Sequence, residues 1–268
     1  MNIVLVHGIL GFGRVGPIGY FNGIAEDLHR RFGASVYAPA LDPTAGTEKR
    51  AAMLRQKIQE ALSQRVLDPL QPIHLIAHSM GGLDARRFLS KDPTIEVGGA
   101  RVPIKTLATI GTPHRGSPIA DVVALKFLPK ASVTDFVLAP AKLALGNVLG
   151  HFGVSLDGLR DLTTEAAKGF NAQFPDHPQV RYMSFGGGGR TGPVPTSRFF
   201  LPYHEFIRIC DGEPSDGVVS VSSAKWTGFD ANLWHGDHAD EVGHDLDRPL
   251  QGPAQETLDR YAAIVQRF

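Results

Sequence analysis

Ser79 stands in a sequence pattern that is typical of an enzyme nucleophile. A strand-like run, 73–78, leads into it, and a glycine pair and a helix-like run follow it. This is the elbow pattern G-x-S-x-G, with Ala77 in the first glycine position. Its sharp turn requires small residues on both sides, and alanine meets this demand nearly as well as glycine. We expect the serine hydroxyl to stand clear of a sheet, with the N–H of Met80 facing the same space. The alternative is a strand that ends in an ordinary Ser-Gly turn.

A second candidate element lies near the N-terminus, where the apolar run 2–6 breaks into His7-Gly8-Ile9. In enzymes with a serine nucleophile, an N–H from such a loop and the N–H after the serine together bind the oxyanion of the reaction. We expect Ile9 and Met80 to be these donors, and His7 to support the loop. By itself, the loop could equally be a plain glycine-rich turn.

A serine hydroxyl becomes a nucleophile only when a base removes its proton, and the base needs an orienting carboxylate. After an elbow serine, the acid precedes the histidine along the chain. Asp216, expected on a turn that follows a strand, is the candidate acid, and His238 in a polar loop is the candidate base. Asp211 remains open for the acid, and His235 or His244 for the base.

Two other histidines, His74 and His78, precede the serine on its own strand and are not expected to reach its hydroxyl. Four residues near the C-terminus could also ligate a metal: Asp237, His238, Asp240 and His244. They lack the helix-borne H-E-x-x-H arrangement, so we do not expect a catalytic zinc.

Apolar periodicity predicts the elements that position these residues. Strands are expected at 2–6, 35–38, 73–78, 104–110 and 180–185, and helices at 20–32, 47–64, 83–89, 160–174 and 253–268. This alternation predicts a mostly parallel sheet with helices on both faces. The apolar segment 117–153 is either a pair of core helices or a mobile lid over the serine. The glycine run 186–189 is expected to be flexible, and 193–203 irregular.

Composition narrows the class of protein. The 268 residues carry 27 basic and 27 acidic side chains, which gives no indication of a nucleic-acid partner. No repeat or linker is visible, so we expect one domain over 1–268. A lone cysteine, Cys210, excludes an internal disulfide. No signal peptide or transmembrane run is recognisable, which leads us to expect a cytoplasmic protein or one exported without a classical signal.

Five motifs follow one another along the chain: Val6-His7-Gly8-Ile9-Leu10-Gly11-Phe12, Ala77-His78-Ser79-Met80-Gly81-Gly82, Gly111-Thr112-Pro113-His114-Arg115-Gly116-Ser117, Asp216-Gly217-Val218-Val219 and Asp237-His238-Ala239-Asp240-Glu241-Val242. In this order they resemble the bacterial family I triacylglycerol lipases over nearly the whole chain. The resemblance implies an α/β-hydrolase fold with a helical lid at about 117–153. It implies Ser79 as nucleophile, Asp216 as acid and His238 as base. It also implies that Ile9 and Met80 supply the oxyanion hole.

The chain departs from that family at its structural calcium site, which uses two aspartates. Asp240 matches one of them, but the stretch Val194-Pro195-Thr196, where the second would fall, has no aspartate. An oxygen site that loses one of two carboxylates loses much of its affinity, so we expect no tightly bound calcium and no other cofactor.

These observations lead us to expect a carboxylic ester hydrolase, a lipase or lipase-like esterase, that forms an acyl-enzyme. Its substrates would be acylglycerols or other apolar esters, met at a lipid–water interface. A thioesterase or polyester depolymerase with the same triad is the alternative enzyme. A binding module that has kept the fold without catalysis is the alternative outside enzymes.

Overall fold

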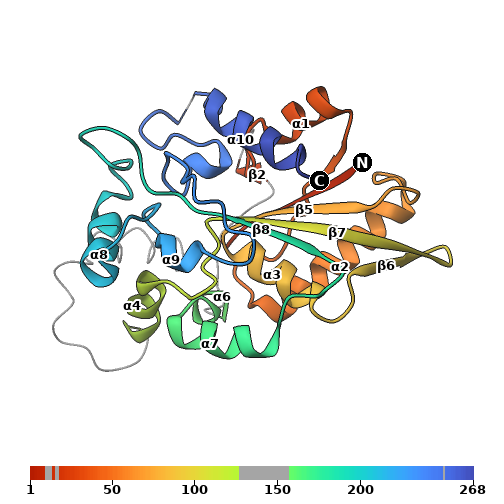
Figure 1. Ribbon diagram of the computed structural model, residues 1–268, viewed down its shortest axis with the longest axis horizontal. Coiled ribbons are helices and arrows are strands. Elements are labelled where there is room, and N and C mark those ends of the chain that lie inside the picture. Colours follow the sequence, from red (N-terminus) through yellow and green to blue (C-terminus); the bar gives the residue numbers. More distant parts are fainter. Residues whose placement is uncertain (10–13, 16–17, 127–156, 250) are drawn as a thin grey trace.

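A six-stranded sheet forms the centre of the computed structural model, which describes residues 1–9, 14–15, 18–126, 157–249 and 251–268 (Figure 1). Its strands are β1 (Asn2–Val6), β4 (Ser35–Tyr37), β5 (Ile73–His78), β6 (Thr94–Val97), β7 (Ala100–Ile110) and β8 (Arg181–Phe185). They run in the order β4-β1-β5-β7, and both β6 and β8 pair with β7. Within this sheet, β6 alone is antiparallel to its neighbour. A short separate ribbon joins β2 (Arg14–Val15) and β3 (Ile18–Gly19).

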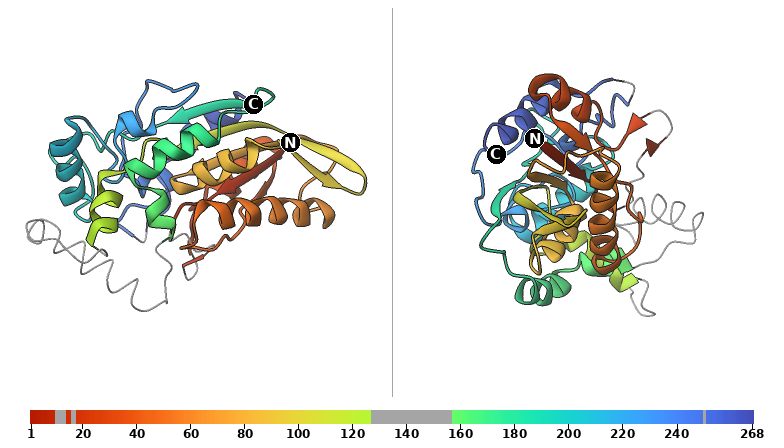
Figure 2. Two further views of the ribbon diagram at one scale, coloured as in Figure 1. Left: turned by 90° about the horizontal axis from the view of Figure 1, so that it is seen from below. Right: turned by 90° about the vertical axis from the view of Figure 1, so that its right-hand side faces the viewer.

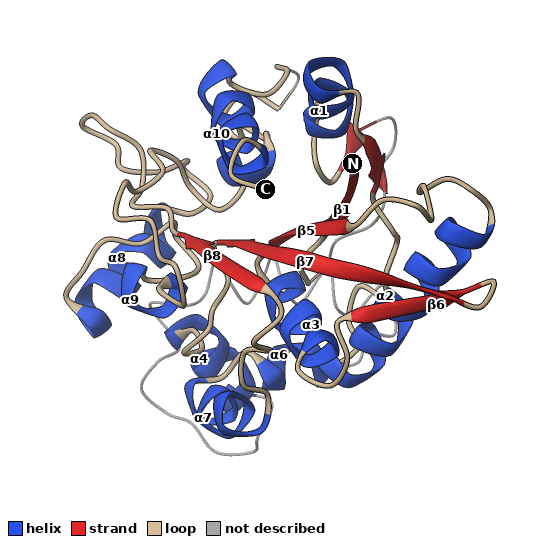
Figure 3. Cartoon of the chain, turned by 45° about the vertical axis from the view of Figure 1, so that its right-hand side comes forward, coloured by secondary structure: helices blue, strands red, loops and turns tan. Residues whose placement is uncertain are grey.

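Helices cover both faces of the sheet, as Figures 2 and 3 show. On one face lie α1 (Ile24–Phe32) and α10 (Gln255–Val265), and on the other α2 (Thr47–Ser63) and α3 (Met80–Leu89). Each face has its own apolar core, because β1 and β5 are buried along their whole length and present side chains to both layers. The predicted fold, a mostly parallel sheet between two helical layers, is confirmed.

The remaining helices surround the carboxyl edge of the sheet. They are α4 (Pro118–Lys126), α6 (Asp157–Asp161), α7 (Thr164–Gln173), α8 (Leu201–Asp211), α9 (Val221–Ala224) and the 3₁₀ turn η1 (Asp240–Val242). The lid expected over 117–153 begins with α4, and from residue 127 onward it lies outside the described residues. None of the described helices combines the length and apolar character that a membrane span would need.

Several predicted elements were wrong in detail. The helix expected over 160–174 is two helices, because Thr163 caps α7 by accepting the N–H of Ala166 at 3.3 Å. The strand expected before Asp216 is helix α8, which also begins within the segment expected to be irregular. The strand expected at 104–110 starts at Ala100 and forms a hairpin with β6 that the sequence pattern did not indicate.

The parallel strands bring four candidate segments to one edge of the sheet. His7 follows β1, Ser79 follows β5, Gly111 follows β7 and the glycine run 186–189 follows β8. In open α/β sheets, ligands bind beyond the carboxyl ends of the strands. The candidate active site therefore lies at this edge.

Candidate active site

Ser79 occupies the strained turn between β5 and α3. Its backbone has φ 56° and ψ −134°, a conformation that residues other than glycine rarely adopt. A Cβ atom on Gly81 would lie 2.5 Å from the carbonyl oxygen of Val6, and one on Gly82 would lie 2.2 Å from Oγ1 of Thr112. The glycines are therefore required because β1 and the segment after β7 pass close to the elbow. Met80 begins α3, where the first N–H groups have no partner within the helix.

The loop after β1 contacts the serine directly. A Cβ atom on Gly8 would lie 2.6 Å from Cβ of Ser79 and 3.0 Å from its Oγ. His7 holds this loop: its Nε2 accepts the N–H of Leu41 at 2.9 Å, so its Nδ1 carries the hydrogen donated to the carbonyl of Gly8 at 2.8 Å. Burial and the nearby Arg50 charge lower the pKa of His7 to about 4, which keeps the ring neutral.

His238 and Asp216 form a hydrogen-bonded pair. Nδ1 of His238 lies 2.7 Å from Oδ2 of Asp216, and this bond fixes the neutral tautomer that leaves the lone pair on Nε2. The other oxygen of Asp216 accepts the N–H groups of Val218 and Val219 at 2.7 and 2.6 Å. Asp216 is fully buried. Three donors and a rigid turn thus orient the carboxylate toward the imidazole.

The other candidates for the acid and the base do not form a pair of this kind. Asp211 is exposed at the end of α8. His235 is 56% exposed and lies 3.7 Å from a carboxylate oxygen of Glu256. Nε2 of His244 lies 3.0–3.1 Å from the carbonyl oxygens of Gly19 and Tyr20. The pairing that the chemistry needs is therefore made by His238 and Asp216.

A buried network beside this pair was missed by the sequence analysis. His78, which was expected only not to reach the hydroxyl of Ser79, lies at the centre of this network, and its ring centroid is 4.3 Å from that of His238. Its Nδ1 lies 2.7 Å from Oη of Tyr20, which also accepts the N–H of Gly8 at 3.1 Å. Its Nε2 lies 3.0 Å from Oε2 of Glu241, and the same oxygen lies 3.5 Å from Nδ1 of His238. The network therefore joins the loop after β1 to the histidine of the pair.

This neutral network holds groups whose surroundings favour their uncharged forms. Burial and the neighbouring His238 lower the pKa of His78 well below its ordinary value. Burial also raises the pKa of Glu241 well above its ordinary value, and the charges of Asp216 and Asp237 add to the effect. The two ring nitrogens of His78 thus join Oη of Tyr20 to Oε2 of Glu241, and the tautomer of the ring sets the direction of each bond. Both shifts favour the uncharged forms of the two side chains.

Glycines allow the two carboxyl groups to lie this close to the sheet. A Cβ atom on Gly111, where φ is 52°, would lie 2.2 Å from Oε2 of Glu241 and 2.9 Å from Oδ2 of Asp216. On Gly187 it would lie 2.7 Å from Oε1 of Glu241. The run 186–189 was predicted to be flexible, and this was wrong: it is largely buried and pairs with residues 234–236. Its lack of side chains serves close packing.

Comparison with known proteins identifies the family of this chain. No family model matches the chain. A triacylglycerol lipase of Pseudarthrobacter phenanthrenivorans is 31% identical over 240 residues, which cover 83% of this chain and 68% of that protein. The chain belongs to the triacylglycerol lipase family. A second lipase of this name, from Vibrio cholerae, is 29% identical over 90% of this chain and 78% of its own.

A solved structure supports the same conclusion for the fold. The lipase of Staphylococcus hyicus matches this lipase-family chain with a TM-score of 0.71 and 18% identity, over 99% of this chain and 94% of the other. The family expected from the five motifs is confirmed, and with it a carboxylic ester hydrolase of the lipase and esterase class.

The residues of this lipase do not fit a calcium ion at Asp240. Both oxygens of that carboxylate face the guanidinium of Arg190, at 2.8 and 3.0 Å, so a divalent cation would meet a positive charge. Among the described residues, His78, His238 and Glu241 bring ligand atoms close enough to share an ion. The hydrogen bonds above already engage three of the four ring nitrogens, and a metal there would compete with the His238–Asp216 pair.

Proposed function

We propose that Ser79, His238 and Asp216 are the catalytic triad of this ester hydrolase, and that the N–H groups of Ile9 and Met80 form its oxyanion hole. The 2.7 Å bond between His238 and Asp216, together with the strained elbow of Ser79, is the observation that carries the proposal. The loop after β1 packs on Ser79 and the N-terminus of α3 follows it, which supports the choice of the two N–H donors.

In the proposed reaction, Oγ of Ser79 attacks the ester carbonyl while its proton passes to Nε2 of His238. Asp216 stabilises the imidazolium that forms. The N–H groups of Ile9 and Met80 bind the oxyanion, and His238 then returns the proton to the leaving alcohol. Water, deprotonated by the same imidazole, attacks the acyl-enzyme and releases the carboxylic acid. The serine recovers its proton in the last step, and the enzyme is regenerated.

We propose apolar esters, acylglycerols among them, as the substrates. The relatives named triacylglycerol lipase support this class. Helix α4 supports it as well, because it begins the 117–153 segment and six of its nine residues are apolar.

Hydrolysis of p-nitrophenyl esters from acetate to palmitate tests the proposal, with wild type beside Ser79→Ala. Ser63→Ala, at an exposed helix position, is the matched control. We expect Ser79→Ala to lower kcat by at least about a thousandfold and to abolish labelling by a fluorophosphonate, because the nucleophile is gone. A Ser79→Ala variant that kept even a tenth of the activity would show that this serine is not the nucleophile. A preference for thioesters over oxygen esters would instead indicate that the enzyme is a thioesterase.

A further inference from the structure

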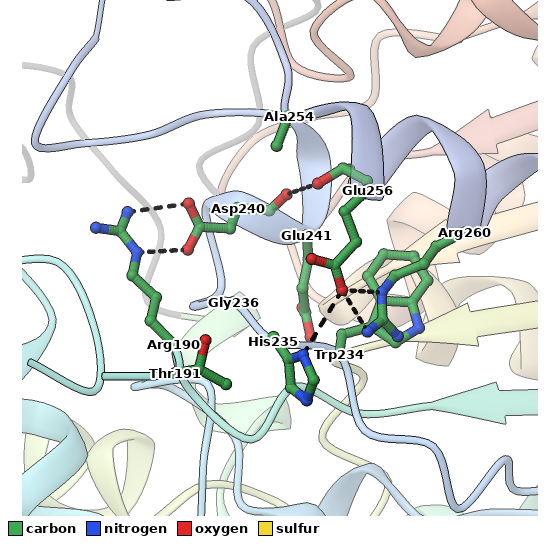
Figure 4. Close-up of a pocket in the computed structure, with 11 residues that line it drawn as sticks. Arg190, Thr191, Trp234, His235, Gly236, Asp240, Glu241, Ala254, Glu256 and Arg260 are labelled. Carbon is green, nitrogen blue, oxygen red and sulfur yellow. Dashed lines mark hydrogen bonds and ion pairs between the residues drawn. The ribbon is translucent and has the colours of Figure 1, made fainter. Parts of the chain in front are cut away.

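Arg190 lies at the centre of a cluster of aspartates beside the active site. It follows the buried glycine run, and its Nε and Nη2 bind the two oxygens of Asp240 at 2.8 and 3.0 Å (Figure 4). Nη2 also bonds Oδ1 of Asp245 at 3.0 Å, and Nη1 bonds Oδ2 of Asp247 at 2.9 Å. Asp237 is the fourth carboxylate, 3.6 Å from Nη2. One guanidinium thus faces four negative charges with all three of its nitrogens.

These aspartates build the turn that carries His238. Oδ1 of Asp237 accepts the N–H groups of Ala239 and Asp240 at 3.0 and 3.1 Å. The N–H of Asp237 in turn donates to Oδ2 of Asp240 at 2.8 Å, the oxygen that also binds Nε of Arg190. Asp237 therefore closes the turn over His238, and its own place is fixed by Asp240 and, at Oδ2, by Oγ1 of Thr196 and the N–H of Ser197 at 3.1 and 2.9 Å. Arg190 fixes the carboxylate of Asp240.

The same arginine connects this turn to the sheet. The segment that precedes it, 186–189, pairs with 234–236, which lead directly into Asp237. The guanidinium therefore joins two neighbouring segments at the point where one of them turns toward the active site. It is about one-fifth exposed and lines a surface pocket of about 230 Å³ (Figure 4). Its partial burial strengthens its attraction to the carboxylates relative to a fully exposed pair.

Removal of this charge would leave four carboxylates to repel one another within one short loop. Arg248 is the other described cation that binds this group: its Nε lies 3.3 Å from Oδ2 of Asp245, and its side chain is 67% exposed. A bidentate arginine can satisfy two oxygens in a fixed plane, whereas an exposed single contact provides little orientation. Arg248 is therefore a suitable control for Arg190, because it binds the same group of aspartates without a bidentate contact.

We propose that Arg190 is the resident cation of the His238 loop, a positioning residue that holds the base over Ser79 and makes a divalent ion unnecessary. The guanidinium neutralises the aspartates and fixes Asp240, which orders the turn of Asp237 and so the backbone of His238. This inference rests on the proposed role of His238 as the base. A side chain of the protein thus neutralises and orients the carboxylates that a bound cation would otherwise hold.

The test compares Arg190→Gln with Arg248→Ala as the matched control. For Arg190→Gln we expect kcat on p-nitrophenyl butyrate to fall about tenfold to a hundredfold with KM within about twofold, because the base is displaced while the substrate site is intact. We expect its thermal midpoint, followed by circular dichroism, to fall by about 5 °C or more. Arg248→Ala should match wild type in both. Wild type dialysed against EDTA should keep its kcat and its midpoint.

Two further variants separate neutralisation from packing. Asp245→Asn in the Arg190→Gln background should recover part of the lost midpoint and kcat, because it removes one repelling charge. Arg190→Lys, which keeps the charge but not the planar fork, should fold with intermediate values even if Arg190→Gln does not fold.

Equal behaviour of Arg190→Gln and Arg248→Ala would overturn the inference, as would loss of wild-type activity in EDTA or no recovery by Asp245→Asn. Ser79→Ala, measured in parallel, separates the two proposals. If it stays active, the proposed triad fails, and the thermal midpoints still decide the role of Arg190.

Discussion

Replacing Tyr20 by phenylalanine removes one oxygen atom from the neutral network beside Ser79. This oxygen accepts the N–H of Gly8 at 3.1 Å and is hydrogen-bonded to Nδ1 of His78 at 2.7 Å. The ring itself would stay in place, because it packs against His7 and Phe21 with centroid distances of 5.5 and 5.1 Å. The substitution therefore deletes two hydrogen bonds with little change in apolar packing.

Both partners of the lost hydroxyl are buried, and this sets the size of the effect. A buried group left without a hydrogen-bond partner costs about 1–3 kcal/mol, so two such groups cost about 2–6 kcal/mol, and we expect a loss of about 3 kcal/mol in the free energy of unfolding. Gly8 lies next to the proposed oxyanion donor Ile9. Loss of one oxyanion donor costs about 10²–10³ in kcat, and its partial misplacement should cost about tenfold to a hundredfold.

Urea unfolding followed by tryptophan fluorescence measures the free energy of unfolding. Steady-state hydrolysis of p-nitrophenyl butyrate measures kcat. Tyr37→Phe is the matched control, since the described part of the chain offers the Tyr37 hydroxyl no hydrogen bond. A Tyr20→Phe variant within about 0.5 kcal/mol of that control, with unchanged kcat, would refute both the network and its link to the oxyanion loop.

Two further predictions concern the carboxyl groups near His238. Asp216→Asn should lower kcat by about 10⁴, because the amide favours the wrong imidazole tautomer, whereas Glu241→Gln, whose group lies 3.5 Å from Nδ1, should lower it by less than about tenfold. Similar losses in the two variants, measured at saturating substrate, would contradict the choice of acid. The raised pKa of Glu241, caused first by burial, also predicts a pH dependence of stability. Between the unfolded pKa of about 4.3 and the higher folded value, unfolding releases a proton, so the free energy of unfolding falls as pH rises, by up to ~1.4 kcal/mol per pH unit. Urea titrations across that range should show this slope in wild type and lose it in Glu241→Gln, and parallel curves would argue against a protonated Glu241.

The sequence predicted those parts of the site that depend on neighbours along the chain. The elbow of Ser79 needs small residues at fixed offsets, and the loop after β1 needs a glycine, so both leave a local pattern. The alternation of strands and helices predicted the parallel sheet, whose strands β1 and β5 are buried on both faces. Short or interrupted elements were less visible: β6 has only 4 residues, and a single capping threonine divides the helix expected over 160–174.

The parts that the sequence did not predict are contacts between distant segments. Tyr20 and His78 are 58 positions apart, and His78 and Glu241 are 163 apart. Arg190 meets Asp240 across 50 positions. No spacing rule relates such residues, and each has an ordinary alternative as a helix-face, strand or surface side chain. Glu241 did stand three residues after His238 in a recognised motif, and that spacing was the one available signal.

The neutral network and the Arg190 cluster together explain how one active site accommodates so many acidic groups. Asp216 accepts three hydrogen bonds, two from backbone N–H groups and one from His238, and these fix the direction of its carboxylate. Burial and the nearby charge of Asp216 raise the pKa of Glu241, which favours the uncharged form of this second carboxyl group. The guanidinium of Arg190 offsets the aspartates that flank His238. The positive charge that develops on His238 in the proposed reaction would therefore face one carboxylate, fixed in direction, and this is the arrangement that stabilises an imidazolium without trapping it.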